Sequence, residues 1–250
     1  MKRFATICKM EFLLFLRDFF SAFFTLAFPV MMLVIFGSIY GNEPVYSGAE
    51  LGAMDISVPA YAVMVMGVTG LMAFPLTLAG YKEKKIYKRF DATPVGKGRI
   101  ILAQVLVNFF MTLAGISLLL LFGKILYHTR ILGSVVSICV SLVVCTAAMF
   151  SMGFLFTAIG RDAKMTNLLC YLFYFVMLFL SGATIPDMLF SESVENISKL
   201  LPMTYAVDFM QGAFAGETLS QHWTELSVLV TLTVLFTAAG AVLYQKKDWS

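Results

Sequence analysis

Six long apolar runs, separated by short polar stretches, dominate this sequence of 250 residues. A helix needs roughly 20 mostly apolar residues to cross about 30 Å of hydrocarbon, and each of these runs is close to that length or exceeds it. With 60% hydrophobic and 13% charged residues, the chain has no room for a sizeable soluble domain. We therefore expect an all-α integral membrane fold with six transmembrane helices. The expected spans are 19–40, 58–80, 100–127, 131–159, 168–185 and 226–244.

The basic residues predict which side of the membrane each end faces. Six crossings place both termini on one side, and with that side inside, 15 of the 18 Lys and Arg residues face the cytoplasm. Only Lys124, Arg130 and Lys199 fall outside. Such a bias over short loops follows the positive-inside rule. We expect a multi-pass protein of the plasma membrane, such as a bacterial inner membrane, with cytoplasmic termini. The net charge of +3 does not suggest nucleic acid as a partner.

Residues 1–18 differ in kind from the spans. Apolar side chains recur there at helical spacing and alternate with charged ones, which is typical of a helix that lies in the headgroup layer. A ragged extension of the first span is the alternative, but Arg17 and Asp18 would be costly at depth. Together with Glu11, these charges also interrupt any signal-peptide core, so we expect the amino terminus to be retained.

The sequence lacks the residue patterns of an enzyme. Its two histidines, His128 and His222, fall in outer connections, so neither an HExxH zinc motif nor an intramembrane serine and histidine pair can form. The four cysteines have neither disulfide nor metal-site spacing, and there is no phosphate-binding loop. We expect no catalytic residue, metal site or nucleotide site in this chain.

Charge within the apolar runs is scarce, which bears on the class of transport. Only Lys124 lies clearly inside a run, and it is near enough to the outer end to snorkel. No Asp or Glu falls in the middle of a span, where proton-driven and sodium-driven carriers usually place carboxylates. This absence counts against a self-sufficient secondary carrier or channel, which we keep as the alternative function. An intramembrane enzyme is a more distant alternative.

The inner segment 81–99 combines a basic helix with an aromatic patch. On a helix, Ile86 and Phe90 stack at i and i+4 with Tyr87 beside them, and basic residues surround this patch. Pro94 stops the helix, and Thr93 can cap the next one. A basic loop that only fixes topology or touches anionic lipid needs neither the paired Ile86 and Phe90 nor a helix stop. A helix that docks into a partner needs both. The segment predicts a docking helix.

The outer segment 186–225 is too short and too polar to cross the membrane. It predicts short re-entrant helices that dip into the outer leaflet, sheltered by the rest of the protein, and that form an outer gate. An ordinary surface lid is the alternative. Polar residues within or beside the spans, which either line a transport path or bond neighbouring helices, are Gln104, Asn108 and Asn167.

These segments resemble the permease subunits of the ABC type-2 transporter family, which are typically exporters. The resemblance covers the whole chain, 1–250, as a single transmembrane domain. It rests on the charged helix before Ala92-Thr93-Pro94-Val95, with Arg99 beyond, and on Ser181-Gly182 followed by Pro186. Most specific is Pro202-Met203-x-Tyr205 with Gln211 six positions on. The sequence departs from the family in the coupling segment, where members often carry a run of acidic, glycine and threonine residues. Here Lys85, Ile86 and Tyr87 occupy that region, and only Glu83 supplies its acidic residue.

The resemblance implies an ATP-driven exporter subunit for an amphipathic or hydrophobic compound, such as a drug, an antimicrobial peptide or a lipid-linked molecule. It implies separate ATP-binding subunits, which hold ATP and Mg²⁺, and a second permease copy or paralogue. By this resemblance the partner-coupling residues are Glu83, Ile86, Tyr87, Phe90, Asp91, Arg161 and Lys164. The outer-gate residues are Gly182, Pro186, Pro202, Tyr205 and Gln211.

Overall fold

The computed structural model describes residues 2–44, 51–91, 96–184 and 190–246, and within these ranges it contains helices and no β-strand. Two of the segments, η1 and η2, are π-helical, and they continue directly into the α-helices around them. The elements are α1 Lys2–Arg17, α2 Phe19–Ala22, η1 Phe23–Ala27, α3 Phe28–Tyr40, α4 Ala53–Gly67, η2 Val68–Ala73, α5 Phe74–Glu83, α6 Ile86–Asp91, α7 Lys97–Tyr127, α8 Val135–Ile159, α9 Ala163–Leu180, α10 Glu192–Ser198, α11 Pro202–Ala215 and α12 Trp223–Lys246.

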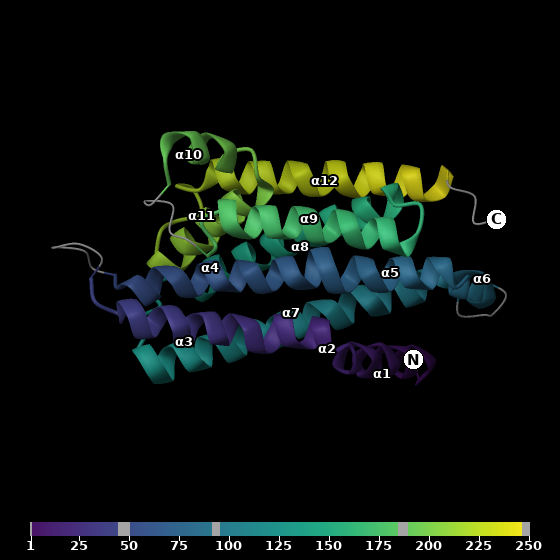
Figure 1. Cartoon of the computed structure of the whole chain (residues 1–250), viewed down its shortest axis with the longest axis horizontal. Helices are drawn as coiled ribbons and strands as arrows, with labels where there is room; N and C mark the ends of the chain where they lie inside the picture. Colours follow the sequence, from purple (N-terminus) through teal and green to yellow (C-terminus); the bar gives the residue numbers. More distant parts are fainter. Residues whose placement is uncertain (1, 45–50, 92–95, 185–189, 247–250) are drawn as a thin grey trace.

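The long helices run side by side along the long axis of the molecule (Figure 1). We call one end of this bundle the α6 end, because α6 lies there together with α1 and the carboxyl-terminal end of α12. The opposite end carries α10 and α11, and we call it the α10 end (Figure 1). Six helical stretches of the described chain are long and apolar enough to cross a membrane, as the sequence predicted. They are Phe19–Tyr40, Ala53–Glu83, Gly98–Tyr127, Val135–Ile159, Ala163–Leu180 and Trp223–Tyr244.

Local capping explains where these stretches depart from the expected bounds. The second begins at Ala53 instead of residue 58, because the Asp55 carboxylate accepts a hydrogen bond from Gly52 N at 2.9 Å and so caps the helix. The fifth begins at Ala163 instead of 168, because Asp162 accepts from Met165 N at 2.7 Å. A polar residue that caps a helix interrupts an apolar run. A prediction from hydropathy alone therefore places the start of such a helix too late in the sequence.

The fourth stretch begins later than expected, at Val135 instead of residue 131. Leu132 N and Gly133 N donate to Phe214 O at the end of α11, at 3.0 and 3.1 Å, so this apolar segment pairs with α11 and is not helical. Ser134 then caps α8 by accepting from Ser137 N. The apolar run included a packing segment that hydropathy cannot distinguish from a helix.

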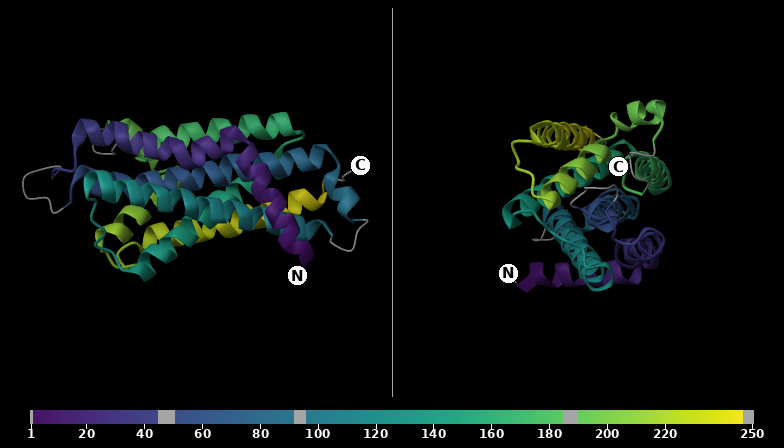
Figure 2. Two further views of the ribbon diagram at one scale, coloured as in Figure 1. Left: turned by 90° about the horizontal axis from the view of Figure 1, so that it is seen from below. Right: turned by 90° about the vertical axis from the view of Figure 1, so that its left-hand side faces the viewer.

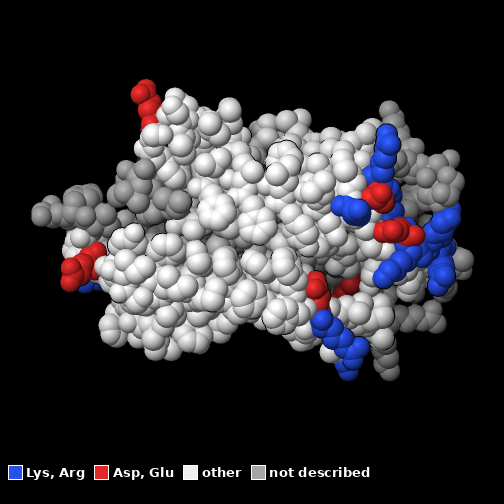
Figure 3. Space-filling view, in the orientation of Figure 1, with Lys and Arg blue, Asp and Glu red and all other residues white. Residues whose placement is uncertain are grey.

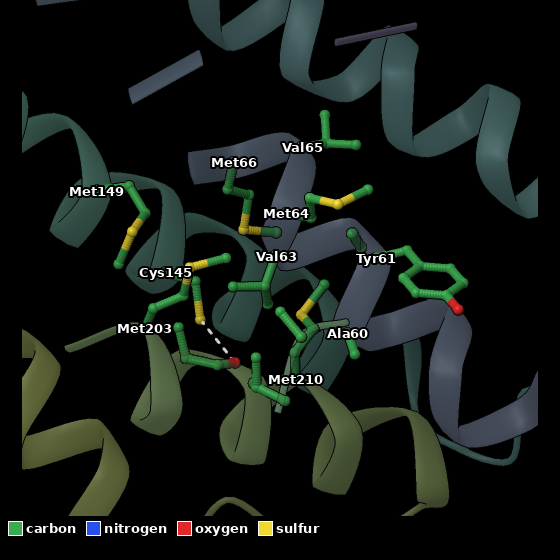
Figure 4. Close-up of a cluster of buried hydrophobic side chains, with 14 of the residues drawn as sticks. Ala60, Tyr61, Val63, Met64, Val65, Met66, Cys145, Met149, Met203 and Met210 are labelled. Atoms are coloured by element: carbon green, nitrogen blue, oxygen red, sulfur yellow. Dashed lines mark hydrogen bonds between the residues drawn. The ribbon is translucent and has the colours of Figure 1, made fainter. Parts of the chain in front are cut away.

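The second span lies at the centre of the bundle. In its most apolar window, 89% of the residues are buried within the protein, against 11% for the last span. Sulfur-rich side chains from α4, α8 and α11 fill the space around it, including Met64, Met149 and Met210 (Figure 4). The Cys145 thiol in this cluster donates to Ala206 O at 3.7 Å (Figure 4). Flexible methionines suit an irregular core of this kind.

Both π-helical segments lie next to a proline. Phe28 N donates to Phe23 O and Phe74 N donates to Thr69 O, each five residues back, just before Pro29 and Pro75. Proline has no N–H, so it cannot complete the normal helical ladder, and the turn before it widens. The first two spans therefore each carry a widened turn, which places backbone carbonyls against their neighbours.

Helix α1 lies obliquely across the α6 end of the bundle, away from the direction of the spans (Figure 2). The chain turns at Asp18, whose backbone is extended and whose carboxylate accepts a hydrogen bond from the Ser21 hydroxyl. Several large apolar side chains of α1 are exposed, among them Phe12, Leu13 and Leu16. An apolar face outside the protein is what a helix in the headgroup layer needs, and that location stays a prediction.

Candidate functional site

Exposed charges gather at the α6 end. In the space-filling view, Lys and Arg side chains cluster there, while the middle of this face is free of charge (Figure 3). Within and just before α6, the exposed side chains include Lys84, Lys85, Lys88 and Arg89, with Glu83 beside them. A charged end and an uncharged middle are typical of a protein that crosses a bilayer, and the end that faces the cytoplasm stays a prediction.

Helix α6 is separated from α5 by a tight turn. Lys84 N bonds Gly80 O at 3.1 Å and Lys85 N bonds Lys82 O at 3.0 Å, and Lys85 adopts a left-handed conformation with φ of 53°. The docking helix expected within segment 81–99 is thus shorter than the run of coupling residues from Glu83 to Asp91: Glu83 ends α5, and α6 covers only Ile86–Asp91. The predicted stop at Thr93 and Pro94 lies outside the described residues, as does the side chain of Asp91.

The two faces of α6 have different surroundings. Tyr87 points inward and is 1% exposed, and its hydroxyl donates to Gln104 Oε1 of α7 at 3.0 Å. It packs among Leu78, Ile100 and Tyr244. Phe90 is half-buried against the same cluster, and Ile86 is also half-buried. Of the predicted coupling residues on α6, Tyr87 therefore anchors the helix to the bundle, and a partner on the basic face would not touch its ring.

The turn between α8 and α9 lies at the same end (Figure 1). Arg161 and Lys164 are exposed on it, whereas Gly160 and Thr166 pack together beneath. Asp162 caps α9 and keeps the turn short. The structure thus places Arg161, Lys164 and the exposed residues of α6 on one end of the molecule.

The polar residues considered for a pathway lie inside the protomer. Gln104 is fully buried and bonded to Tyr87, and Asn108 Nδ2 donates to Gln104 O at 2.9 Å. Asn108 also lines a cavity of about 50 Å³. Asn167 is half-buried, and its Oδ1 has no hydrogen-bond partner among the described residues. Their part in transport stays a prediction.

At the α10 end, a short buried helix closes the bundle. Helix α11 begins at Pro202 and packs on α4 and α8, with Met203, Phe209 and Phe214 buried. At 14 residues it is about 21 Å long, too short to cross a bilayer. Whether it is re-entrant depends on where the membrane lies, and that expectation stays a prediction.

Two of the predicted gate residues hold this end together. Tyr205 OH donates to Lys199 O at 2.8 Å, and Gln211 Nε2 donates to Ile56 O of α4 at 3.2 Å. Gly182 has a φ of 81°, which glycine adopts without strain, and it turns the chain after α9. Pro186 lies outside the described residues.

A cavity of about 140 Å³ lies between α4, α11 and the turn after α9. Gly182 and Gln211 both line it, so two of the predicted gate residues face a common space. Its other polar lining includes Tyr61, Thr204 and Asp208. The sequence predicted the segments around this cavity but could not show that α4 supplies its inner wall.

The sequence did not predict that two acidic residues, Glu11 and Asp55, are buried. Glu11 was assigned to the polar face of α1, but it is 4% exposed, on the buried stripe formed by Ile7 and Phe15. Its spacing of four residues from each of them was the available signal. At the α10 end, Asp55 is buried and accepts hydrogen bonds from Asn42 Nδ2 at 3.0 Å and Arg130 N at 2.8 Å.

The comparison with protein families decides the assignment. A family model described as ABC-2 type transporter matches residues 2–215, which is most of the chain. The chain belongs to the ABC-2 type transporter family. It is therefore a multi-pass membrane protein and the permease component of an ABC transporter. Such permeases are transport components that are generally not catalytic, and they normally work with ATP-binding subunits. No curated protein matches the sequence.

Proposed function

We propose that this permease is the membrane subunit of an ATP-driven exporter and that its ATP-binding partner docks at the α6 end. The observation that carries the proposal is the two-faced environment of α6. Its exposed cations, among them Lys88 and Arg89, are free to meet another surface, while Tyr87 fixes its other side to α7. A helix held in this way transmits a push into the bundle instead of yielding locally.

The route of that push follows the packing at the α6 end. Tyr87 contacts Gln104 of α7, and its cluster includes Tyr244 near the end of α12. Lys82 of α5 lies over the Tyr244 ring, 5.8 Å from its centre. Closure of a partner on ATP would therefore move α5, α6, α7 and α12 together. The energy comes from the difference in ATP affinity between the two conformations.

The passenger is an amphipathic or hydrophobic compound, and its path involves a second permease. At the α10 end, the cavity beside α11 has a volume of about 140 Å³, and a second cavity beside Asp55 and His128 has about 210 Å³. Both are smaller than the roughly 300 Å³ of the smallest usual sites for drug-sized molecules. A permease with cavities of this size needs the face of a second copy or a paralogue to form a wider passage. Gln211, Tyr205 and Gly182 then hold the outer exit closed.

The orientation follows from the charges. With the α6 end in the cytoplasm of a plasma membrane, both termini and the exposed cations of α6 face inward, where the positive-inside rule puts them. Helix α1 then lies in the inner headgroup layer. ATP and Mg²⁺ are held by the partner, because this chain carries no phosphate-binding motif.

A pull-down tests the proposal. The tagged protein is extracted from its native membrane in a mild detergent, the retained proteins are identified by mass spectrometry, and ATP hydrolysis by the eluate is measured. We expect an ATP-binding subunit and hydrolysis in the eluate. A chain that comes out alone and inert in several mild detergents contradicts the proposal, and transport by that purified chain under an ion gradient would make it a secondary carrier.

A further inference from the structure

A single acidic side chain interrupts the buried stripe of α1. Ile7, Glu11 and Phe15 are 8%, 4% and 7% exposed, so all three face the bundle at successive turns. Around them α1 exposes Met10, Phe12 and Leu14. Burying a carboxylate among apolar neighbours costs free energy unless it is hydrogen-bonded. An apolar residue at this position would be buried at a lower free-energy cost. Its presence points to a role other than stability.

Glu11 is bonded to the second span. Tyr81 OH in α5 donates to Glu11 Oε1 at 3.0 Å. Burial raises the pKa of Glu11, and the hydrogen bond from Tyr81 opposes that rise in pKa. The carboxylate is thus bonded to α5.

Tyr81 connects this carboxylate to α6. The centre of its ring lies 5.8 Å from that of the Tyr87 ring, and Tyr87 OH donates to Gln104 Oε1 of α7 at 3.0 Å. Glu11, Tyr81, Tyr87 and Gln104 therefore form one buried cluster, the Glu11 cluster, to which α1, α5, α6 and α7 each contribute a residue. Tyr87 is the member on α6, and Glu11 is the member on α1.

A small polar cavity lies on the other side of Glu11. It has a volume of about 50 Å³ and is lined by Glu11, Asp18, Ser21, Thr77 and Asn108 together with apolar side chains. This is enough room for water, which needs roughly 10–15 Å³. A carboxylate next to such a cavity can shift its bonds as α1 moves without becoming fully desolvated.

We propose that Glu11 is a positioning residue that ties α1 to α6, so that the two helices move as one body when the ATP-binding partner displaces α6. The inference rests on the proposed function, since it takes α6 as the helix that the partner pushes. It adds that the push reaches α1 at the membrane surface through Tyr81, in addition to the spans.

The first experiment tests the tie without any partner. Amide hydrogen exchange is measured on the purified chain in lipid nanodiscs for Glu11→Leu, Glu11→Gln and the control Lys9→Leu, which removes an exposed charge from the same helix. We expect Glu11→Leu to speed exchange of α6 amides roughly tenfold, the size of one lost hydrogen bond. Glu11→Gln keeps an acceptor oxygen for Tyr81 and should restore most of the protection. Unchanged exchange in α6 of Glu11→Leu overturns the proposal.

The second experiment tests transmission in the complex retained with its ATP-binding subunit. Exchange is compared without nucleotide and after trapping with ATP and vanadate. We expect trapping to change exchange in α6 and α1 together in the native complex, and in α6 alone in Tyr81→Phe and Glu11→Leu, because each of these variants lacks the hydrogen bond between Tyr81 and Glu11. A native complex in which α6 responds and α1 does not overturns the inference. If α6 itself does not respond, the proposed function fails instead, while the first experiment still tests the tie.

Discussion

Gly153 of α8 lies against the backbone carbonyl of Gly70 in η2, so closely that a Cβ atom at position 153 would overlap that oxygen. The carbonyl is free to face α8 because Phe74 N bonds Thr69 instead, and Pro75, the next possible donor, has no N–H. The same arrangement occurs in the first span, where Gly115 of α7 lies against Thr25 O of η1. Each widened turn is thus matched by a glycine on a neighbouring helix.

The Gly153 contact predicts that Gly153→Ala destabilises the protein. The added methyl meets backbone atoms that cannot rotate away, so α8 and η2 must separate, at a cost of about 1–3 kcal/mol. Thermal unfolding of the detergent-purified protein measures the loss. Gly80→Ala is the matched control, because an added Cβ atom at Gly80 meets nothing within 4 Å. Equal melting temperatures for the two variants would show that the contact tolerates the methyl.

Asp55 at the α10 end predicts a larger loss. Its carboxylate accepts from Gly52 N, Asn42 Nδ2 and Arg130 N, so it joins the start of α4 to the connection between α7 and α8. Asp55→Ala leaves these donors without their acceptor and should cost on the order of 3 kcal/mol. Ser57→Ala serves as the control, since the Ser57 hydroxyl bonds only within its own helix, to Ala53 O. Similar unfolding temperatures for both would contradict the assigned role.

Charge reversal tests the docking surface. The exposed cations of α6 suit an acidic surface on the ATP-binding subunit, and Lys88→Glu combined with Arg89→Glu would face that surface with like charges. Like charges across an interface cost at least about 1.4 kcal/mol, so the amount of ATP-binding subunit retained in a pull-down should fall roughly tenfold. Lys199→Glu applies the same chemistry to an exposed residue at the α10 end and should leave the yield unchanged. A similar loss in both variants would point to misfolding, and no loss in either would remove α6 from the interface.

Glu11 predicts a pH dependence of stability. Burial raises its pKa in the folded protein above the ordinary 4.5, so the folded state binds the proton more tightly than the unfolded state. The stabilisation is full below about pH 4.5 and is lost as pH rises through the folded pKa. The side chain in Glu11→Gln does not titrate, so this variant does not lose that stabilisation as pH rises. The unfolding temperature of Glu11→Gln minus that of the native protein should therefore increase with pH. The measurement is thermal unfolding of both proteins between about pH 5 and pH 8, and parallel curves would contradict the burial of the carboxylate.

Much of the architecture could be predicted because apolar runs of span length have few ways to fold in a membrane. The number of spans, the basic end and the presence of short helices within 186–225 follow from hydropathy and charge, since the backbone must satisfy its own hydrogen bonds in lipid. The second span was expected to end at residue 80, but its helix continues to Glu83, and α6 begins at Ile86. Lys85 makes the turn between them in a left-handed conformation, which the residue type lysine does not predict.

The sequence by itself determined which segments are helical spans and which end carries the positive charge, because both depend on composition along the chain. Only the tertiary structure decided which polar residues are buried and what they bond. Glu11 bonds Tyr81, and Gln104 bonds Tyr87, and these hydrogen bonds exist only once α1, α5, α6 and α7 pack. The same holds for Gly70 and Gly153, whose close approach depends on the widened turn that Pro75 imposes on one helix and on the absence of a side chain in the other.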